Sequence, residues 1–314
     1  YNRDDIFTWS HISSINESIG TSNDMFGASI AQYSNRVLIG SPGHDGNKGR
    51  VSLFLLDNST GTWYKQGHAF GANPGDRTGC SMAMNEETIL FGAENYLGKG
   101  IVYVREELNG YLGYIATPSL TAGDGQAGDK FGCALSMWKN TTVIGAAKSS
   151  TSAGMAYVFV KNPDRLSWTE LSLVSTTFRG AGNLFGSSVA IYGTFILIGA
   201  PGALNGRGTV YLYRPAEGNI WVESSMLTAE SGDADGNFGV SVSIWENTFL
   251  IGAKGENSSG RASVFRTVDD NRWYEVDTLS ASDDHASNSF GASAQLYDDL
   301  ALVGAPTSLT LGGA

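Results

Sequence analysis

Short segments with the polarity pattern of β-strands follow one another along this chain. Residues 185–193 alternate small or apolar side chains with polar ones, which predicts a half-buried strand. Residues 195–200 form an unbroken apolar run that is too short for a helix and predicts a strand buried on both faces. Residues 209–213 alternate again with a period of two, and a fourth strand opens at Trp221. The pattern therefore predicts a unit of four antiparallel strands joined by short loops.

The same unit recurs six times, and each copy carries two glycines that lie 13 residues apart. Successive first glycines are separated by 52, 53, 54, 53 and 52 residues. The first glycine follows Phe in five units and Thr78 in the other. The pairs are Gly27/Gly40, Gly79/Gly92, Gly132/Gly145, Gly186/Gly199, Gly239/Gly252 and Gly291/Gly304. A period near 50 residues with four strands per unit predicts the blades of a β-propeller.

We therefore predict an all-β fold in which residues 1–314 form a single propeller of four-stranded antiparallel blades. Counting strands favours six blades, with seven as the alternative. An N-terminal strand at about residues 6–14 is expected to close the last blade, and the chain is expected to continue past Ala314. The paired glycines are expected where the backbones of inner strands approach, and the Phe is expected to wedge between neighbouring sheets.

The motif of Phe-Gly followed by Gly-Ala-Pro or a variant of it closely resembles the FG-GAP repeat, which forms the blades of the integrin α-subunit head. The resemblance covers about residues 7 to 314 and implies an extracellular propeller, usually seven-bladed, that binds other macromolecules. Integrin-type blades often carry a DxDxDG calcium loop between the two glycines. Here that hairpin reads only YSNR, NEET, WKNT, YGTF, WENT or YDDL. Calcium needs six to eight oxygen ligands, so calcium is not predicted in these hairpins.

Composition and charge argue against several other functions. The net charge is −11 and Lys and Arg do not cluster, which disfavours nucleic acid and anionic membranes as partners. No apolar run approaches the ~20 residues that span a bilayer, so direct membrane insertion is not predicted. The inner strands ASIAQ, CSMAM, CALSM, SSVAI, VSVSI and ASAQL contain no Asp, Glu or His. That composition argues against an active site lining the channel, and we expect a non-enzymatic protein, with a propeller hydrolase as the least favoured class.

Four sequons and two cysteines bear on the cellular compartment. The sequons lie at Asn16, Asn58, Asn140 and Asn257, each in a predicted turn or loop, and they favour a secreted or cell-surface glycoprotein. Cys80 and Cys133 each follow the first glycine of adjacent units. Their spacing is not that of a zinc site. Two interpretations stay open at this point, buried free thiols or a disulfide between the two units.

Candidate binding residues lie in the loops on one face of the predicted propeller. Acidic residues recur just before the Phe-Gly motif, where a short carboxylate can cap the backbone N–H groups of a turn. The alternative is a weak divalent-cation site, best placed at Asp233 and Asp235; no cofactor is required, and weak Ca²⁺ is the only one considered. On the same face we expect Tyr96, Arg179 and Arg207 to contact a ligand, since Tyr and Arg are enriched at interfaces.

Together these features predict an extracellular recognition or adhesion module that binds protein or glycan through its loop face. The alternative is a structural subunit that self-assembles into an extracellular filament or a surface coat. No residue in the sequence identifies a ligand.

Overall fold

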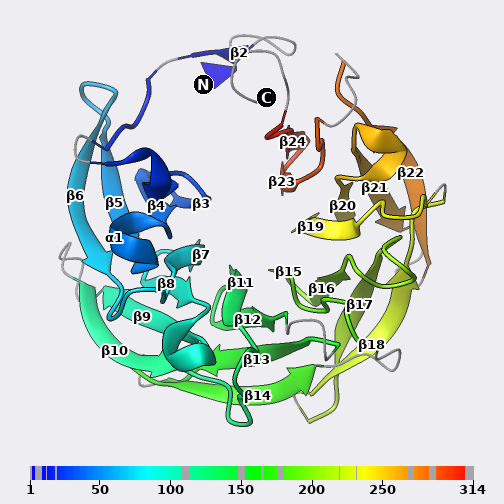
Figure 1. Ribbon diagram of the computed structural model, residues 1–314, viewed down its shortest axis with the longest axis horizontal. Coiled ribbons are helices and arrows are strands. Elements are labelled where there is room, and N and C mark those ends of the chain that lie inside the picture. Colours follow the sequence, from blue (N-terminus) through cyan, green and yellow to red (C-terminus); the bar gives the residue numbers. More distant parts are fainter. Residues whose placement is uncertain are drawn as a thin grey trace.

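The computed structural model describes residues 2–3, 9–11, 13–17, 20–107, 114–147, 153–163, 166–174, 180–218, 220–230, 232–267, 272–282 and 288–307. Within these residues the sheets follow one another around a central axis, as the blades of a propeller do (Figure 1). Five sheets have four strands and a sixth has two, so the predicted all-β propeller of about six blades is confirmed.

Each blade is an antiparallel sheet whose strands follow the order of the chain. Blade 1 comprises β3 (Ser29–Tyr33), β4 (Arg36–Ser41), β5 (Arg50–Asp57) and β6 (Thr62–Phe70). Blade 2 comprises β7 (Thr78–Met84), β8 (Thr88–Ala93), β9 (Ile101–Glu107) and β10 (Tyr114–Leu120). Blade 3 comprises β11 (Phe131–Trp138), β12 (Thr141–Ala146), β13 (Met155–Lys161) and β14 (Trp168–Val174).

Blade 4 comprises β15 (Ser188–Tyr192), β16 (Phe195–Ala200), β17 (Thr209–Ala216) and β18 (Ile220–Leu227). Blade 5 comprises β19 (Phe238–Trp245), β20 (Thr248–Ala253), β21 (Arg261–Thr267) and β22 (Trp273–Leu279). Blade 6 comprises β23 (Ser293–Tyr297) and β24 (Leu300–Gly304). The first strand of every blade lies nearest the axis (Figure 1).

The N-terminal residues form a small sheet of their own. Here β1 (Asn2–Arg3) pairs with β2 (Trp9–Ser10) in antiparallel register. Among the described residues β24 pairs only with β23, so closure of the last blade by residues 6–14 stays a prediction. Residues 308–314 lie outside the described residues.

Glycines hold successive blades together at the start of the first strands. Gly186 has φ +88°, a conformation that side chains rarely adopt. Gly199 lies against the carbonyl oxygen of Gly239 in the next blade, where a Cβ would overlap the backbone. The same contact recurs between Gly40 and Gly79, Gly92 and Gly132, Gly145 and Gly186, and Gly252 and Gly291. At these five boundaries between blades 1 and 6, contacts between the backbones therefore require glycine.

The hydrophobic core lies between the blades. Phe131, Phe185 and Phe238, the Phe of the repeat in blades 3 to 5, are at most 1% exposed. Phe185 packs with residues of both blade 3 and blade 4, including Val143 and Ile196. The predicted wedging role of this Phe is confirmed in these blades.

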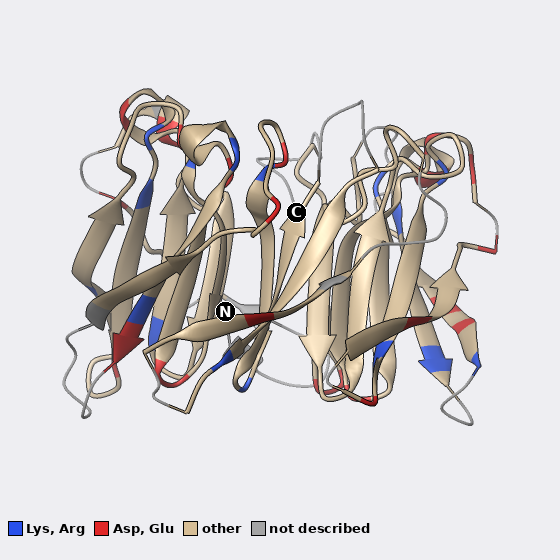
Figure 2. Ribbon diagram, turned by 90° about the horizontal axis from the view of Figure 1, so that it is seen from below, with Lys and Arg blue, Asp and Glu red and all other residues tan. Residues whose placement is uncertain are grey.

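Two edges of the sheets define two faces of the molecule (Figure 2). The loop face carries the connections between second and third strands and those between blades. These connections include η1 (Ser22–Asp24), α1 (His44–Asn47), η2 (Tyr96–Gly98) and η3 (Glu256–Ser258). The hairpin face carries the short turns between first and second strands and between third and fourth strands. Acidic and basic residues are interspersed on both faces (Figure 2).

Candidate binding site at the hairpin face

Aromatic residues surround the central axis at the hairpin face. They occupy one repeat position, the last residue of the first strand, in five of the six units. We call these five residues the aromatic collar: Tyr33, Trp138, Tyr192, Trp245 and Tyr297. Asn85 holds the corresponding position in blade 2, directly after β7. The collar arises because each first strand ends in a tight hairpin that turns the chain beside the axis.

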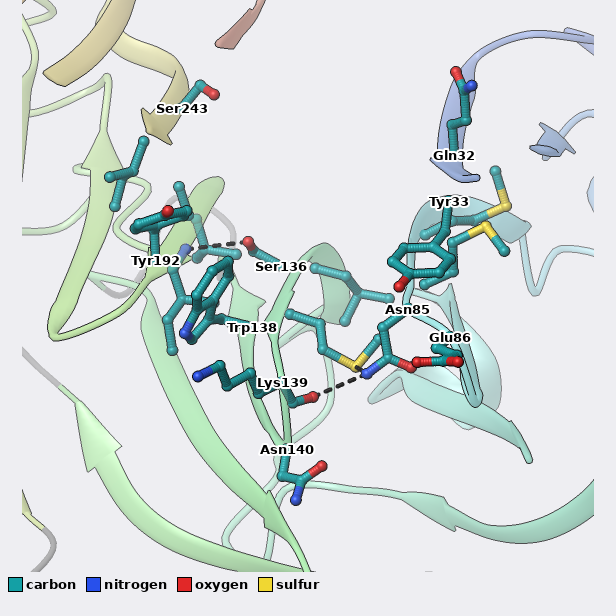
Figure 3. A pocket seen from close by; sticks show the side chains of 18 of the residues that line it. Gln32, Tyr33, Asn85, Glu86, Ser136, Trp138, Lys139, Asn140, Tyr192 and Ser243 are labelled. Atoms are coloured by element: carbon teal, nitrogen blue, oxygen red, sulfur yellow. Dashed lines mark hydrogen bonds between the residues drawn. The ribbon is translucent and has the colours of Figure 1, made fainter. Parts of the chain in front are cut away.

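Four collar rings contact one another across blade boundaries. The centroids of Trp138 and Tyr192 are 4.1 Å apart, with an interplanar angle of 40°. Tyr192 and Trp245 are 5.4 Å apart at 49°, and Trp245 and Tyr297 are 4.6 Å apart at 50°. Tyr33 lies on the other side of the cavity from Trp138 and Tyr192 (Figure 3). The rings thus form a continuous arc from blade 3 to blade 6, with Tyr33 facing it.

The collar lies at the mouth of a central cavity of about 1090 Å³. Its wall combines polar groups with apolar side chains of the first strands, and the apolar ones are Ile30, Met82, Met84, Leu135, Met137, Val189, Ala190, Ile191, Val242, Ile244 and Leu296. The polar part of the wall includes hydroxyl and amide groups. Ser136 Oγ accepts a hydrogen bond from the Ile191 N–H at 3.1 Å, and Ser243 Oγ accepts one from the Leu296 N–H at 2.9 Å. These hydrogen bonds connect neighbouring blades and so fix the position of the first strands that form the cavity wall.

Among the described residues that line the cavity, the ionised ones lie at one part of the rim. Glu86 and Lys139 are exposed there, and the Lys139 ammonium lies 5.7 Å from the centroid of the Trp138 ring. Lys161 is buried, and its Nζ lies 2.7 Å from Glu106 Oε2 and 2.9 Å from Thr88 Oγ1. This lysine is therefore committed to a buried ion pair between blades 2 and 3.

Exposure differs along the collar. Tyr297 is 65% exposed and Tyr33 is 40% exposed, whereas the other three rings are half-buried. Ring-on-ring packing explains the difference, because Trp138, Tyr192 and Trp245 cover parts of one another. Tyr33 and Tyr297 are thus the collar residues with the most exposed surface for a ligand. The other three rings pack against one another, and Trp245 supports the ring of Tyr297.

Comparison with known proteins agrees with this architecture. Three segments of the chain, residues 116–159, 179–213 and 221–265, match the FG-GAP repeat family model. The fold is a β-propeller, and these three segments of it are FG-GAP repeats. No curated protein matches the sequence.

Two solved structures share the fold of this FG-GAP propeller. Sqt1 of Saccharomyces cerevisiae is 10% identical with a TM-score of 0.51, and the match covers 91% of this chain and 81% of that one. A protein from Lactobacillus plantarum is 12% identical with a TM-score of 0.56, and the match covers 81% of this chain and 71% of that one. At such identities the likeness concerns the fold alone.

The residues predicted to bind ligand lie on the loop face and are not brought together. Tyr96 lies in η2 of blade 2 and packs edge-on against Tyr103, with centroids 6.2 Å apart. Arg207 is exposed in the loop between β16 and β17 of blade 4, so blade 3 separates it from Tyr96. Arg179 lies outside the described residues. Their role in binding stays a prediction.

The loop-face carboxylates shape their own loops. The Asp233 carboxylate accepts a hydrogen bond from the Asn257 N–H at 3.0 Å, and the Asp233 N–H donates to Glu256 Oε2 at 3.1 Å. Asp235 adopts a left-handed backbone, with φ +63°. Asp76 and Asp129 accept hydrogen bonds from backbone N–H groups three residues earlier, as the capping interpretation predicts. Within the described residues no group of three or more His, Cys, Asp or Glu is placed to hold a metal.

The sequon asparagines and the cysteines can also be placed. All four sequon residues, Asn16, Asn58, Asn140 and Asn257, are exposed. Asn140 lies at the hairpin face beside the collar and lines the cavity. Cys80 and Cys133 are free thiols, so the first of the two sequence-based interpretations holds in this structure. In the part of the chain that the structure describes, no helix is long and apolar enough to cross a membrane.

Sequence reasoning missed the collar, although a signal for it was present. Five of the six hairpins begin with an aromatic residue, as in the tetrapeptides YSNR, WKNT, YGTF, WENT and YDDL. The tetrapeptides lack the spaced carboxylates of a calcium loop, but their first residue is aromatic in all but NEET. A repeat position that is aromatic in nearly every blade, and close to the axis, predicts a ring of aromatic side chains.

Proposed function

We propose that this FG-GAP propeller is an extracellular, non-enzymatic recognition module that binds its ligand at the collar and the central cavity of the hairpin face. The observation that supports this most is the collar itself. The collar lines a large concave surface, which is the usual form of a binding site, and it presents aromatic rings beside polar groups. Tyr and Trp supply large contact areas and carry a polar group as well, which makes them frequent binding anchors.

The chemistry of the cavity supports binding without catalysis. Of the four ionised residues in its lining, Lys161 is held in a buried ion pair. Among the described lining residues there is no histidine, and the two carboxylates, Glu86 and Glu87, are neighbours in the single hairpin between β7 and β8. General acid–base catalysis commonly uses a histidine, or two carboxylates that face each other across the substrate. The exposed sequons support the extracellular assignment, since a glycan at Asn16, Asn58 or Asn257 would project into solvent away from the cavity.

The experiment tests which of the two faces binds the ligand. A glycan array and a phage-displayed peptide library are probed with wild-type protein and with three variants: Tyr297→Ala at the collar, Arg207→Ala at the loop face and Tyr274→Ala on β22. Tyr274 is 48% exposed and far from the cavity lining, so it is the matched control. We expect about a tenfold or greater loss of affinity for Tyr297→Ala, the range of an interface anchor, and no change for the other two variants. Binding that is lost only with Arg207→Ala would assign function to the loop face instead.

One observation favours a structural subunit as the second candidate. Leu302 is 75% exposed and Ile30 is 63% exposed, on the strands β24 and β3 of the last and first blades. Large exposed apolar side chains favour association with another chain. Light scattering of the purified glycoprotein, with and without a calcium chelator, tests this candidate. A monomer at micromolar concentration would argue against it, whereas assemblies that dissolve in a Leu302→Glu variant would support it.

A further inference from the structure

We infer that the ligand of the collar is a neutral polysaccharide chain. The inference rests on the proposed function and narrows the ligand from any macromolecule to one chemical class. Three properties of the hairpin face support it: the charge balance of the cavity, the polar groups that remain available there, and the exposure of two collar rings.

The first property is the absence of a charge excess. The cavity lining contains two carboxylates, Glu86 and Glu87, and two ammonium groups, Lys139 and Lys161. Lys161 is already paired with Glu106 at 2.7 Å and lies 3.5 Å from Glu87. A site that selects an anionic or a cationic ligand needs a clear excess of the opposite charge. The lining has none, so it favours a ligand without net charge.

The second property is the kind of polar group that lines the cavity. Five amides occur in the lining: Gln32, Asn85, Asn140, Asn162 and Gln295. A side-chain amide both donates and accepts hydrogen bonds, as a sugar hydroxyl does, so amides match a surface of hydroxyl groups. Few ligands other than sugars present many uncharged hydroxyls together.

Not all five amides are available to a ligand. Asn85 donates to the Lys139 carbonyl oxygen at 2.9 Å and accepts from the Thr88 N–H at 2.8 Å, which fixes its orientation (Figure 3). Asn162 donates to Ser167 Oγ at 2.9 Å. Gln32 and Gln295 are exposed and use only their amide N–H groups, on the backbone carbonyls of Ser34 and Leu296. Their side-chain oxygens are the amide groups that a sugar would meet, since Asn140 is itself a predicted glycosylation site.

The third property is the free ring surface of Tyr297 and Tyr33. The C–H groups of a sugar ring form an apolar face with partial positive charge, which packs well on the negative face of an aromatic ring. Tyr297 is 65% exposed and Gln295 precedes it by two residues on β23. Tyr33 is 40% exposed and adjoins Gln32 on β3. Each of the two strands thus presents a stacking surface together with an amide.

The size of the cavity indicates a chain of sugars. Its volume of about 1090 Å³ slightly exceeds the range of about 300–1,000 Å³ that is usual for small-molecule sites. The site is also open at the hairpin face, where Tyr33 and Tyr297 stand at the rim. Affinity should therefore increase with chain length until both tyrosines are engaged.

The test uses the two collar tryptophans as reporters. Intrinsic fluorescence of the full chain is followed during titration with neutral oligosaccharides of increasing length. They are built from glucose, mannose, xylose or galactose and are chosen from the neutral glycans that bind on the array. Charged oligosaccharides and library-selected peptides are titrated in parallel. We expect a neutral series to change the fluorescence of Trp138 and Trp245, with affinity that rises with length and is unchanged between 0.05 and 0.5 M NaCl, because no charges pair.

Variants assign the binding to the collar. Tyr297→Ala should weaken the neutral glycan by about tenfold or more, whereas Tyr297→Phe should retain most of the affinity because the ring face remains. Tyr274→Ala should leave the affinity unchanged. The exposed position of Tyr297 makes loss of folding unexpected, and a thermal melt of each variant checks this.

The outcomes separate the inference from the proposed function. If no neutral glycan binds, and a peptide or a charged glycan binds with the same dependence on Tyr297, the polysaccharide inference is overturned and the recognition site stands. If neither the array nor the library yields a ligand that depends on Tyr297, both are overturned.

Discussion

The first strand of each blade begins at the loop face and ends at the hairpin face, and the two ends are held in different ways. At the loop face, glycine contacts glycine: Gly199 lies against the Gly239 carbonyl oxygen, and the contact recurs at each boundary between blades 1 and 6. At the hairpin face, side chains make the contacts, as Trp138 does with Tyr192. The contact positions at the loop-side end therefore accept only glycine. The hairpin-side end tolerates different side chains and can acquire a binding surface.

The hairpin face itself divides into two sectors. From blade 3 to blade 6 the collar rings form the contacts between blades. Between blades 1 and 2, Arg36 Nη1 lies 2.6 Å from Glu107 Oε2, and between blades 2 and 3, Lys161 Nζ lies 2.7 Å from Glu106 Oε2. Ion pairs thus replace ring stacking where blade 2 has Asn85 in place of an aromatic residue. The aromatic sector offers a ligand apolar surface, while the ionic sector serves the stability of the fold.

The largest loss of folding stability is expected when a buried ion pair of the ionic sector is broken. Lys161→Met leaves Glu106, which is 2% exposed in its side chain, without its cationic partner. Removing one partner of a buried pair costs about 3–5 kcal/mol, because the remaining charge stays buried. Denaturant unfolding of Lys161→Met should show a loss of this size.

Two further variants make that comparison sharper. Arg77→Met at the loop face breaks a pair with Glu94 whose Arg side chain is 33% exposed, and the expected loss is about 1 kcal/mol or less. The double variant Lys161→Met/Glu106→Leu should recover much of the stability, because no buried charge remains. Equal losses for Lys161→Met and Arg77→Met would show that the two faces are not stabilised differently.

A somewhat smaller effect is expected from the glycine contacts. A Cβ in Gly199→Ala would overlap the carbonyl oxygen of Gly239, so the backbones of blades 4 and 5 must separate. Overpacking of this kind costs about 1–3 kcal/mol and sometimes more. The control is Gly67→Ala on β6, where nothing lies near an added Cβ and the expected change is below about 1 kcal/mol. Urea unfolding measures both, and a Gly199→Ala variant as stable as Gly67→Ala would contradict the proposed contact.

The difference between the two ends also explains what the sequence could predict. Glycine at Gly199 and Gly239 is required by backbone geometry, so it recurs in every unit and its period predicts the blades. The contact of Trp138 with Tyr192 depends on how neighbouring blades are rotated about the axis, and strand patterns alone do not specify that. Arg36 is the only basic residue at its repeat position, so repetition does not mark its pair with Glu107. The repeating blade was therefore predictable from the sequence. The contacts among the collar residues could be recognised only once the blades were assembled around the axis.

The smallest effect concerns the thiols at the loop-side end, where the next blade covers the start of each first strand. Cys80 Sγ lies 3.5 Å from the Gly132 carbonyl oxygen and Cys133 Sγ lies 3.6 Å from that of Gly186. Burial raises the pKa of Cys80 to about 12 and that of Cys133 to about 11. A raised pKa keeps both thiols protonated at pH 8, where only about one in a thousand or fewer would be thiolate, against about a quarter for a thiol of pKa ~8.5.

Iodoacetamide should therefore alkylate the native chain at pH 8 at least about 100-fold more slowly than the chain unfolded in guanidinium, because only the thiolate reacts. Mass spectrometry counts the adducts, with two expected after unfolding without reductant. Rapid labelling of the native protein would show that the loop-side strand ends open in solution. An absence of adducts even after unfolding would instead indicate a disulfide between the two units, and the tight loop-side contact would then owe part of its strength to a covalent bond.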